Sequence, residues 1–351
     1  MIGPRGSLDL HPTPHADKTT MKILVTGGAG FIGSHLVEAL VRRGDEVVIL
    51  DSLNDFYDPA IKRRNLACIE RTAGAPLGDG PVEFVEGDIR DQALMGELFE
   101  RDFDAVVHLA AMAGVRPSLE DPLHYQDVNL RGTVVLLEEL RKRPGTRFVF
   151  ASSSSVYGGN EDVPFKESAD VPRPVSPYAA TKRAGELLCY THHHLYGIPT
   201  TCLRFFTVFG PRQRPEMAIH KFVRMTLEGQ ALPFFGDGST RRDYTYVDDI
   251  VDGVVRSIDR CSGYEIYNLG ESETTSLSEL VRMIGEACGV EPILDRKPMQ
   301  PGDVLITYAD TTKARKELGY DPRTPVAEGL RRFVAWYREH AMGDGVSSAS
   351  I

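Results

Sequence analysis

The stretch Thr26-Gly27-Gly28-Ala29-Gly30-Phe31-Ile32-Gly33 decides the fold of this chain. It follows the apolar run 23–25, and apolar residues then recur at helical spacing, so the pattern predicts a buried strand, a glycine-rich turn and a helix. Glycines at 27, 30 and 33 would let the backbone turn tightly, admit a pyrophosphate and bring the helix close to the sheet. The free N–H groups that open the helix would face the phosphates. Because such a turn also occurs without a ligand, the interpretation needs support from elsewhere.

The same alternation of apolar runs and helical segments continues to about residue 150. Four further runs predict buried parallel strands, at 47–50, 82–85, 105–109 and 148–150. A helical segment at 129–143 separates the last two. Repeated βαβ units imply an α/β fold with a doubly wound parallel (Rossmann) sheet, whose ligands bind along the carboxyl edge of the strands. We therefore expect a Rossmann domain over residues 21–205.

The pattern changes after about residue 205, where prolines, glycines and basic residues become frequent. We interpret 203–210 and 234–249 as loops, and 206–340 mainly as a smaller C-terminal substrate-binding lobe. A later strand and helix near 240–260 are expected to return to the first domain. Further helices are expected at 277–287, 312–318 and 326–340. The ends, 1–20 and 341–351, have the composition of a disordered extension and tail.

Composition excludes several classes of function. The chain has 351 residues and a formal net charge of −10, so binding to nucleic acid would gain nothing from counterion release. No apolar run approaches the ~18 residues that span a bilayer, and the first 20 residues lack the apolar stretch of a secretory signal. Five cysteines without a CxxC indicate a reducing, cytoplasmic setting. Consecutive histidines at 192–194 would point in different directions on a helix, so we expect no metal site.

Two carboxylates follow predicted strands on the side where a dinucleotide would bind. Asp51 ends the second strand, and its carboxylate would accept hydrogen bonds from adenosine ribose hydroxyls and repel a 2′-phosphate, which favours NAD over NADP. The basic run 62–64 weakens that preference. Asp88, just after the third strand, could meet the adenine amino group or cap the next helix.

The most informative stretch is Ser176-Pro177-Tyr178-Ala179-Ala180-Thr181-Lys182. Ser176 can cap a helix and Pro177 suits its first turn, which puts Tyr178 and Lys182 on one helical face. A free phenol has a pKa of ~10, too high for a base at neutral pH, and a nearby ammonium lowers it. The Tyr-x-x-x-Lys spacing alone is common in surface helices. Here it is joined by the serine run 152–155, which follows the fifth predicted strand.

Together these motifs resemble the extended short-chain dehydrogenase/reductase family, from Lys22 to about His340. The resemblance includes His108-Leu109-Ala110-Ala111, Asn129, Arg242-Asp243-Tyr244 and Val247-Asp248-Asp249. It implies that Tyr178 is the acid/base, that Lys182 binds the nicotinamide ribose and tunes the phenol, and that Ser153 is the assisting hydroxyl. The cofactor it implies is NAD. The residues assigned to NAD are Gly27, Gly30, Phe31, Ile32, Gly33, Asp51, Asn54, Asp88, Ile89, Leu109, Ala110, Ala111, Tyr178 and Lys182.

The residues around the serine run indicate which reaction follows oxidation at the sugar C4. Related 4,6-dehydratases carry Asp-Glu where this chain has Ser154-Ser155, and UDP-glucuronate decarboxylases carry Glu at the position of Ser155. Without either acid, the keto sugar is left to turn over and take its hydride back on the other face. The resemblance therefore implies a 4-epimerase that regenerates its NAD.

The stretch 204–218 carries the signal for the substrate. Thr207 stands where galactose-type epimerases usually have Asn, and Arg-Gln-Arg-Pro at 212–215 resembles bacterial UDP-glucuronate 4-epimerases, as does 54–59. That resemblance implies that Arg214 binds the sugar carboxylate, for which a planar guanidinium is suited. The role of Arg212 stays open. The substrate residues it implies are Ser153, Ser154, Thr207, Arg214, Arg242 on the diphosphate and Asp303 on the uridine ribose.

Three alternatives stay open at this stage. The nearest is a UDP-glucose/UDP-galactose 4-epimerase with the same chemistry. A UDP-glucuronate decarboxylase and a non-catalytic NAD-sensing protein fit less well, since the acid of the former is missing and the Tyr/Lys pair that the latter tends to lose is present. Gln300, where relatives often carry Arg, puts one phosphate contact in doubt. A homodimer is implied by the resemblance alone.

Overall fold

The computed structural model describes residues 20–299 and 304–340. The interpretations of 1–19 and 341–351, and the assignment of Asp303, fall outside the described residues. Within them, a parallel seven-stranded sheet runs in the order β11-β6-β5-β4-β1-β2-β3. The strands are β1 (Lys22–Thr26), β2 (Glu46–Asp51), β3 (Val82–Glu86), β4 (Ala105–His108), β5 (Arg147–Ser153), β6 (Thr200–Phe205) and β11 (Tyr264–Leu269). The doubly wound Rossmann sheet expected from the sequence is confirmed.

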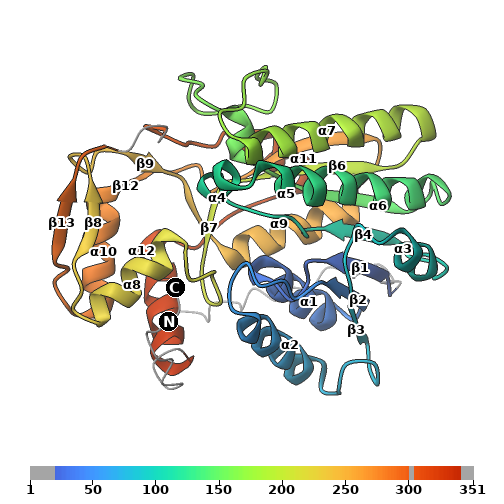
Figure 1. Cartoon of the computed structure of the whole chain (residues 1–351), viewed down its shortest axis with the longest axis horizontal. Helices are drawn as coiled ribbons and strands as arrows, with labels where there is room; N and C mark the ends of the chain where they lie inside the picture. The colour runs from blue at the N-terminus through green and yellow to red at the C-terminus, as the bar shows by residue number, and fades with distance from the viewer. Residues whose placement is uncertain (1–19, 300–303, 341–351) are drawn as a thin grey trace, which may run out of the picture.

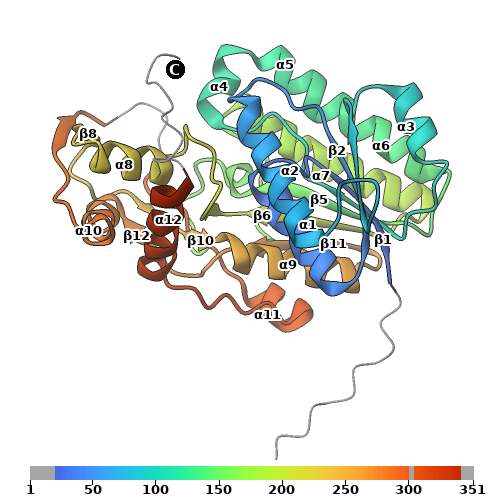
Figure 2. The ribbon, with the colours of Figure 1, turned by 90° about the horizontal axis from the view of Figure 1, so that it is seen from below.

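Helices cover both faces of this sheet (Figures 1 and 2). One face carries α1 (Phe31–Arg43), α2 (Pro59–Ala73) and α9 (Val247–Arg260), and the other carries α3 (Gln92–Leu98), α6 (Gly132–Arg141) and α7 (Pro177–Tyr196). Strand residues alternate between the two cores: Ile23 and Val25 pack with α1, while Leu24 packs on the opposite side. The strand order reverses between β1 and β4, which opens a crevice at their carboxyl ends.

Short elements connect the crevice to its surroundings. After β4 come α4 (Val115–Glu120), α5 (Pro122–Gln126) and a π-helical turn, Asp127–Arg131, that leads into α6. A single 3₁₀ turn, Ser154–Tyr157, follows β5.

A smaller lobe lies beside the carboxyl edge of the sheet, on the left of Figure 1. It contains α8 (Ala218–Leu227), α10 (Leu277–Cys288) and α12 (Val326–His340), with the paired strands β8 (Leu232–Phe235) and β13 (Leu294–Lys297). Two further pairs are β7 (Thr207–Phe209) with β10 (Tyr244–Tyr246), and β9 (Arg241–Arg242) with β12 (Thr275–Ser276). The helix α11 (Thr312–Leu318) packs instead on α9 and β11.

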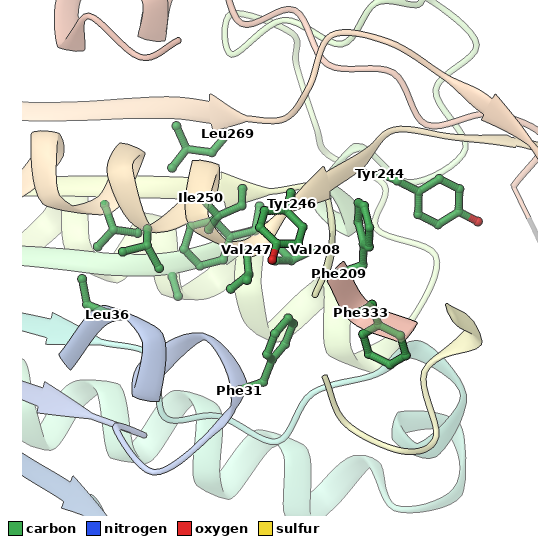
Figure 3. Close-up of a cluster of buried hydrophobic side chains, with 14 of the residues drawn as sticks. Phe31, Leu36, Val208, Phe209, Tyr244, Tyr246, Val247, Ile250, Leu269 and Phe333 are labelled. Atoms are coloured by element: carbon green, nitrogen blue, oxygen red, sulfur yellow. The ribbon is translucent and has the colours of Figure 1, made fainter. Parts of the chain in front are cut away.

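One apolar core joins the lobe to the sheet. Figure 3 shows Phe31 of α1, Phe209 of β7 and Phe333 of α12 in the same buried cluster. The β7–β10 pair is therefore packed against both α1 and the helix α12 of the smaller lobe. The exact limits of the two predicted domains stay a prediction.

The interpretation of 203–210 and 234–249 as loops was wrong. Residues 203–205 lie in β6, 207–209 form β7, and the second stretch holds parts of β8, β9 and β10. These strands were hidden because they are short and carry polar residues, such as Arg204 and Thr245, that are buried only with partners from elsewhere. The expected return to the Rossmann sheet is made by α9 and then by β11, which begins at Tyr264.

Candidate active site

A cavity of about 620 Å³ opens at the carboxyl ends of β1, β4 and β5. The predicted cofactor and sugar residues that line it come from every part of the Rossmann sheet and from the start of the lobe. They are Gly27, Gly30, Phe31, Ile32, Gly33, Asp51, Asn54, Asp88, Ile89, Leu109, Ala110, Ala111, Ser153, Ser154, Tyr178, Lys182, Thr207 and Arg214. Arg242 does not line this cavity; its guanidinium donates to the carbonyl of Arg241.

The glycine turn has the close approaches that its sequence predicts. A Cβ on Gly33 would lie 2.2 Å from the carbonyl oxygen of Gly27. Gly27 has a φ of +73°, and a Cβ there would lie 2.7 Å from the backbone nitrogen of Ala110. The helix that follows starts at Gly30 without a side-chain cap and without an acidic residue in its first turn. Its free N–H groups and positive end are thus left for an anionic ligand, which is what the diphosphate of NAD requires.

Asp51 is held at the end of β2 with its carboxylate facing the cavity. Its two oxygens accept hydrogen bonds from the N–H groups of Ala29 and Leu53, at 3.2 and 2.9 Å, and each retains a lone pair for a ribose hydroxyl. The ammonium of Lys62 lies 3.7 Å away and donates to the side chain and carbonyl of Asn54. Lys62 is therefore engaged by protein oxygens beside the position that a 2′-phosphate would take.

Asp88 lines the cavity but caps no helix. Its carboxylate accepts from Arg90, with Nη2 at 2.6 Å and Nε at 3.0 Å, and this hydrogen bonding lowers the pKa of Asp88. The side chain that caps α3 is Asp91, three residues further on. The capping alternative for Asp88 was therefore wrong, and its contact with adenine stays a prediction.

Tyr178 and Lys182 lie in the first turns of α7, as predicted. Ser176 caps the helix by accepting from the N–H of Ala179 at 3.1 Å, and Pro177 begins it. The Nζ atom of Lys182 donates to the carbonyl of Ala151 at 2.7 Å and lies 6.0 Å from the centroid of the Tyr178 ring. Burial lowers the pKa of Lys182 to about 8.

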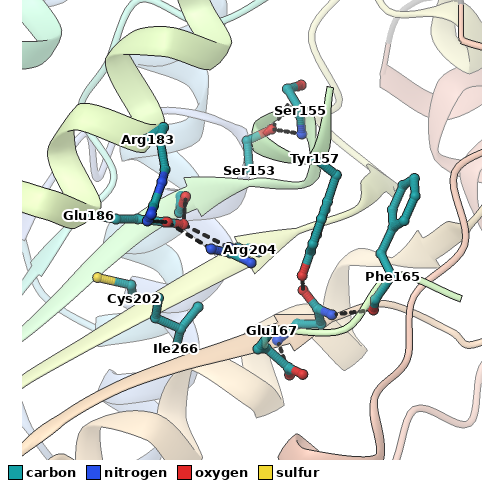
Figure 4. Close-up of polar contacts among 12 residues, drawn as sticks. Ser153, Ser155, Tyr157, Phe165, Glu167, Arg183, Glu186, Cys202, Arg204 and Ile266 are labelled. Carbon is teal, nitrogen blue, oxygen red and sulfur yellow. Dashed lines mark hydrogen bonds and ion pairs between the residues drawn. The ribbon is translucent and has the colours of Figure 1, made fainter. Parts of the chain in front are cut away.

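The electrostatics of Tyr178 differ in part from the sequence-based expectation. Burial raises its pKa, while a hydrogen bond from Ser153 and the charge of Arg214 act in the opposite direction. The strand and helix that meet here place these groups together: Ser153 ends β5, and its hydroxyl oxygen lies 3.1 Å from that of Ser155 (Figure 4). The serine and the arginine therefore favour the phenolate, against the effect of burial.

A buried ion pair supports the strands on which the site is built. Arg204 of β6 binds the carboxylate of Glu186 of α7 at 2.8 and 2.9 Å, and Ser152 of β5 donates to the same carboxylate at 2.6 Å (Figure 4). In the sequence, Ser152 lies between Ala151, whose carbonyl binds Lys182, and Ser153. Nothing local in the sequence announces this pairing, because its partners come from three separate elements.

The loop after β4 is fixed to α7 by one amide. Asn129, in the π-helical turn, accepts from the N–H of Met112 at 2.8 Å and donates to the Met112 carbonyl and to Thr181. Turns of this kind are frequent at functional sites.

His108 at the end of β4 lies between Thr26 and Thr133, and burial lowers its pKa to about 3, so it is neutral.

Arg214 reaches the sugar end of the cavity. Its guanidinium lies 5.6 Å from the ring of Phe56 and pairs with Glu216 at 3.1 Å. The neighbouring wall holds Tyr57, which the sequence analysis quoted without assigning it a role. Other lining residues that sequence reasoning did not assign are Lys62, Arg90, Met112, His124 and Met217.

The comparisons with known proteins agree with this geometry. Residues 23–270, more than half of the chain, match the NAD dependent epimerase/dehydratase family. The chain belongs to this family. The predicted resemblance, the NAD cofactor and the enzymatic nature of the chain are thereby confirmed.

Several relatives in the epimerase/dehydratase family are named nucleotide-sugar 4-epimerases. UDP-glucuronate 4-epimerase 4 of Arabidopsis thaliana is 42% identical over 346 residues, which cover 93% of this chain and 77% of that protein. The structure of UDP-glucuronic acid 4-epimerase from Bacillus cereus, with UDP-glucuronic acid and NAD, has a TM-score of 0.83 at 36% identity, covering 91% of this chain and 99% of that one. UDP-glucose 4-epimerase from Thermotoga maritima, with UDP-glucose, has a TM-score of 0.82 at 34% identity and the same coverages. Overall shape therefore does not separate the two sugars.

The described residues also bear on membrane-spanning helices and on metal sites. In the described part of the chain, no helix has the length and apolar character needed to cross a membrane. The described residues also contain no cluster of His, Cys, Asp and Glu that could hold a metal ion. The imidazoles of His192 and His193 bind the carbonyls of Leu188 and Ile198.

Proposed function

We propose that this protein interconverts UDP-glucuronate and UDP-galacturonate by inverting C4 of the sugar. At the coarser level it is an NAD-dependent nucleotide-sugar 4-epimerase, on its family and its relatives. The observation that carries the finer proposal is Arg214, a guanidinium at the sugar end of the cavity that also holds Tyr178 and Ser153. A cation there suits a sugar that carries a carboxylate at C5.

The residues of the cavity suit proton transfer at the C4 hydroxyl. Tyr178 would take the hydroxyl proton and later return it, while Ser153 holds the oxygen by hydrogen bonding. Gly27–Gly33 and Asp51 would hold NAD, which would supply a reversible acceptor for the C4 hydride. Lys182 would hold the nicotinamide ribose from its place on the Ala151 carbonyl. Ser154 and Ser155 offer no carboxyl group to expel water or protonate a carbon, which favours inversion as the outcome.

Arg214 has a second task in this proposal. A uronic acid oxidised at C4 is a β-keto acid, and it loses CO₂ fastest when the bond from C5 to the carboxylate stands perpendicular to the ketone plane. Arg214 and Thr207 would hold the carboxylate away from that geometry. Arg214→Ala is therefore expected to release more UDP-4-ketopentose per turnover than the wild type, measured by mass spectrometry of the products. Equal release from both proteins contradicts this role.

A comparison of two substrates tests the proposed function. We expect kcat/KM for UDP-glucuronate to exceed that for UDP-glucose by about 100-fold or more, since the neutral sugar offers Arg214 no carboxylate to bind. The reverse preference would establish the UDP-glucose 4-epimerase alternative. Formation of a UDP-pentose as the main product would establish the decarboxylase, and failure to convert either sugar would favour a non-catalytic NAD-binding protein.

We also propose that the protein works as a homodimer in the cytoplasm. Support for the dimer comes from exposed apolar side chains on one helix, α7: Leu187, Tyr190 and Leu195 are each at least half exposed. Light scattering of the purified protein tests this state, and a monomer mass would contradict it. Besides a second copy of the chain, the partner we propose is the UDP-sugar substrate of the preceding test.

A further inference from the structure

The three residues of Arg-Gln-Arg at 212–214 point in three directions. Arg214 lines the cavity. Gln213 is buried, donating to the carbonyl of Val208 at 2.9 Å and accepting from the N–H of His220 at 3.1 Å. Arg212 leaves the loop altogether and reaches α1, so the motif holds two arginines with separate tasks. We call residues 210–217 the arginine loop.

Two turns shape the arginine loop. The N–H of Gln213 donates to the carbonyl of Gly210 at 3.1 Å, with Pro211 and Arg212 between them. Arg212 has a φ of +65°, the left-handed conformation that such a turn requires at its third residue and that glycine adopts most readily. A second turn, from Arg214 to Met217, follows directly. An arginine at a position suited to glycine indicates that its side chain serves a purpose.

That side chain is tied to the cofactor-binding helix. The guanidinium of Arg212 donates to both carboxylate oxygens of Glu38, at 2.8 and 3.1 Å, and the two side chains are only 10% and 9% exposed. His35, one turn earlier on α1, accepts from the same guanidinium at 3.0 Å through Nδ1. Its Nε2 lies 2.9 Å from the carbonyl of Pro211 and donates to it. Burial lowers the pKa of His35 to about 3, so the ring is neutral. The tautomer with its proton on Nε2 donates to Pro211 and accepts from Arg212 at Nδ1, and leaves the 3.2 Å approach of the Arg212 Nε to Nε2 without a hydrogen bond.

These contacts span the two halves of the site. The helix α1 begins at the glycine turn predicted to hold the cofactor phosphates, and Phe31 of its first turn packs in the same core as Phe209 just before the loop (Figure 3). Arg214 stands two residues after the residue that is fastened. The partners of Arg214 itself are the ring of Phe56 and half-exposed Glu216, and buried Gln213 lies between it and Arg212.

We infer that Arg212 is a positioning residue whose ion pair with Glu38 fixes the arginine loop to α1 and so places Arg214 for the sugar carboxylate, an inference that rests on the proposed function. Misplacing a binding group by about 1 Å can cost about 100-fold in rate. The pair should therefore act on the uronate and leave the nucleotide part of the ligand unaffected.

Three variants of the NAD-loaded protein test the inference. Arg212→Gly removes the side chain and relieves the backbone, Glu38→Gln weakens the pair without changing the loop, and Arg42→Ala is the matched control. Arg42 binds the same carboxylate at 3.2 Å but is 63% exposed and lies outside the loop. We expect Arg212→Gly and Glu38→Gln to weaken binding of UDP-glucuronate by about ten-fold and to leave binding of UDP unchanged, as measured by calorimetry. Arg42→Ala should match the wild type for both ligands.

Hydrogen exchange provides a second measurement that does not depend on the sugar. Amides of the arginine loop should exchange faster in Glu38→Gln than in Arg42→Ala. Unchanged binding ratios together with unchanged exchange overturn the inference, as does an equal effect of Arg42→Ala. A third outcome separates the two proposals. If Glu38→Gln speeds exchange in the arginine loop, but the wild type does not prefer UDP-glucuronate over UDP, the Arg212–Glu38 pair holds the loop on α1 and the proposed function is wrong.

Discussion

The phenol of Tyr178 lines the cavity, and the hydroxyl of Ser153 and the charge of Arg214 affect how readily it loses its proton. Burial raises its pKa, and the hydrogen bond from Ser153 opposes that rise. Removing the hydroxyl in Ser153→Ala removes a group that favours the phenolate, so the pKa of Tyr178 should rise further. We expect the acidic limb of the kcat/KM profile to move to higher pH. Ser153→Thr, which keeps the hydroxyl, should restore it, and an unmoved limb in Ser153→Ala would contradict this role.

At the same scale, the sequence identified most of the site because motif residues lie close together along the chain. Tyr178, Lys182 and Ser153 all line the predicted cavity. The charge balance could not be predicted: Lys182 is occupied by a backbone carbonyl, and Arg214 is the cation that lowers the pKa of the phenol. Both facts depend on residues about 30 positions away, for which the sequence carries no local signal.

Among the elements, the π-helical turn is held by the buried amide of Asn129 and by an ion pair between Asp127 and Arg90. Asn129 is buried and satisfies both backbone groups of Met112 as well as the hydroxyl of Thr181. Asn129→Ala would leave these groups unpaired, and we expect it to lower the free energy of unfolding by about 1–3 kcal/mol. Urea denaturation measures this change. A variant as stable as the wild type would mean that water replaces the amide.

The strand β6 shows why some elements escaped prediction. The sequence Thr-Thr-Cys-Leu-Arg-Phe lacks the continuous apolar character of β1, since Arg204 is charged. It is nevertheless only 1% exposed, because Glu186, itself 0% exposed, neutralises it across α7 and β6. Apolar periodicity predicts strands made of apolar residues. It misses strands such as β6, whose buried charge is neutralised by a residue of another element.

The Glu186–Arg204 pair allows a prediction for the packing of these elements. Glu186→Leu alone would leave the Arg204 guanidinium buried without its counter-ion, and should destabilise the fold by about 3–5 kcal/mol. Glu186→Leu combined with Arg204→Met should recover much of that loss, because no buried charge remains. Denaturant unfolding of both variants measures this. A double variant no more stable than the single one would show that the ion pair contributes more than neutralisation.

For the whole molecule, Glu271, a half-buried acid just after β11, makes stability depend on pH. Burial raises the pKa of Glu271 to about 8, with Asp249 and Asp243 adding to the rise, and its Oε2 has no partner among the described residues. A folded pKa above the unfolded one means that the contribution is fully present below pH 4.5 and is lost as pH rises through about 8. Wild type should therefore lose stability between about pH 4.5 and 8 relative to Glu271→Gln, with little further change above that range. Exposed Glu291→Gln serves as control, and parallel curves for all three would contradict the prediction.

We expect one tightly bound NAD to accept the C4 hydride of the uronic sugar and return it within each catalytic cycle. The protein as purified, without added NAD, can be incubated with UDP-glucuronate deuterated at C4, and the products separated and analysed by mass spectrometry and NMR. We predict UDP-galacturonate that retains the deuterium at C4. Absence of the galacturonate product, or its appearance with the deuterium lost, would contradict the account.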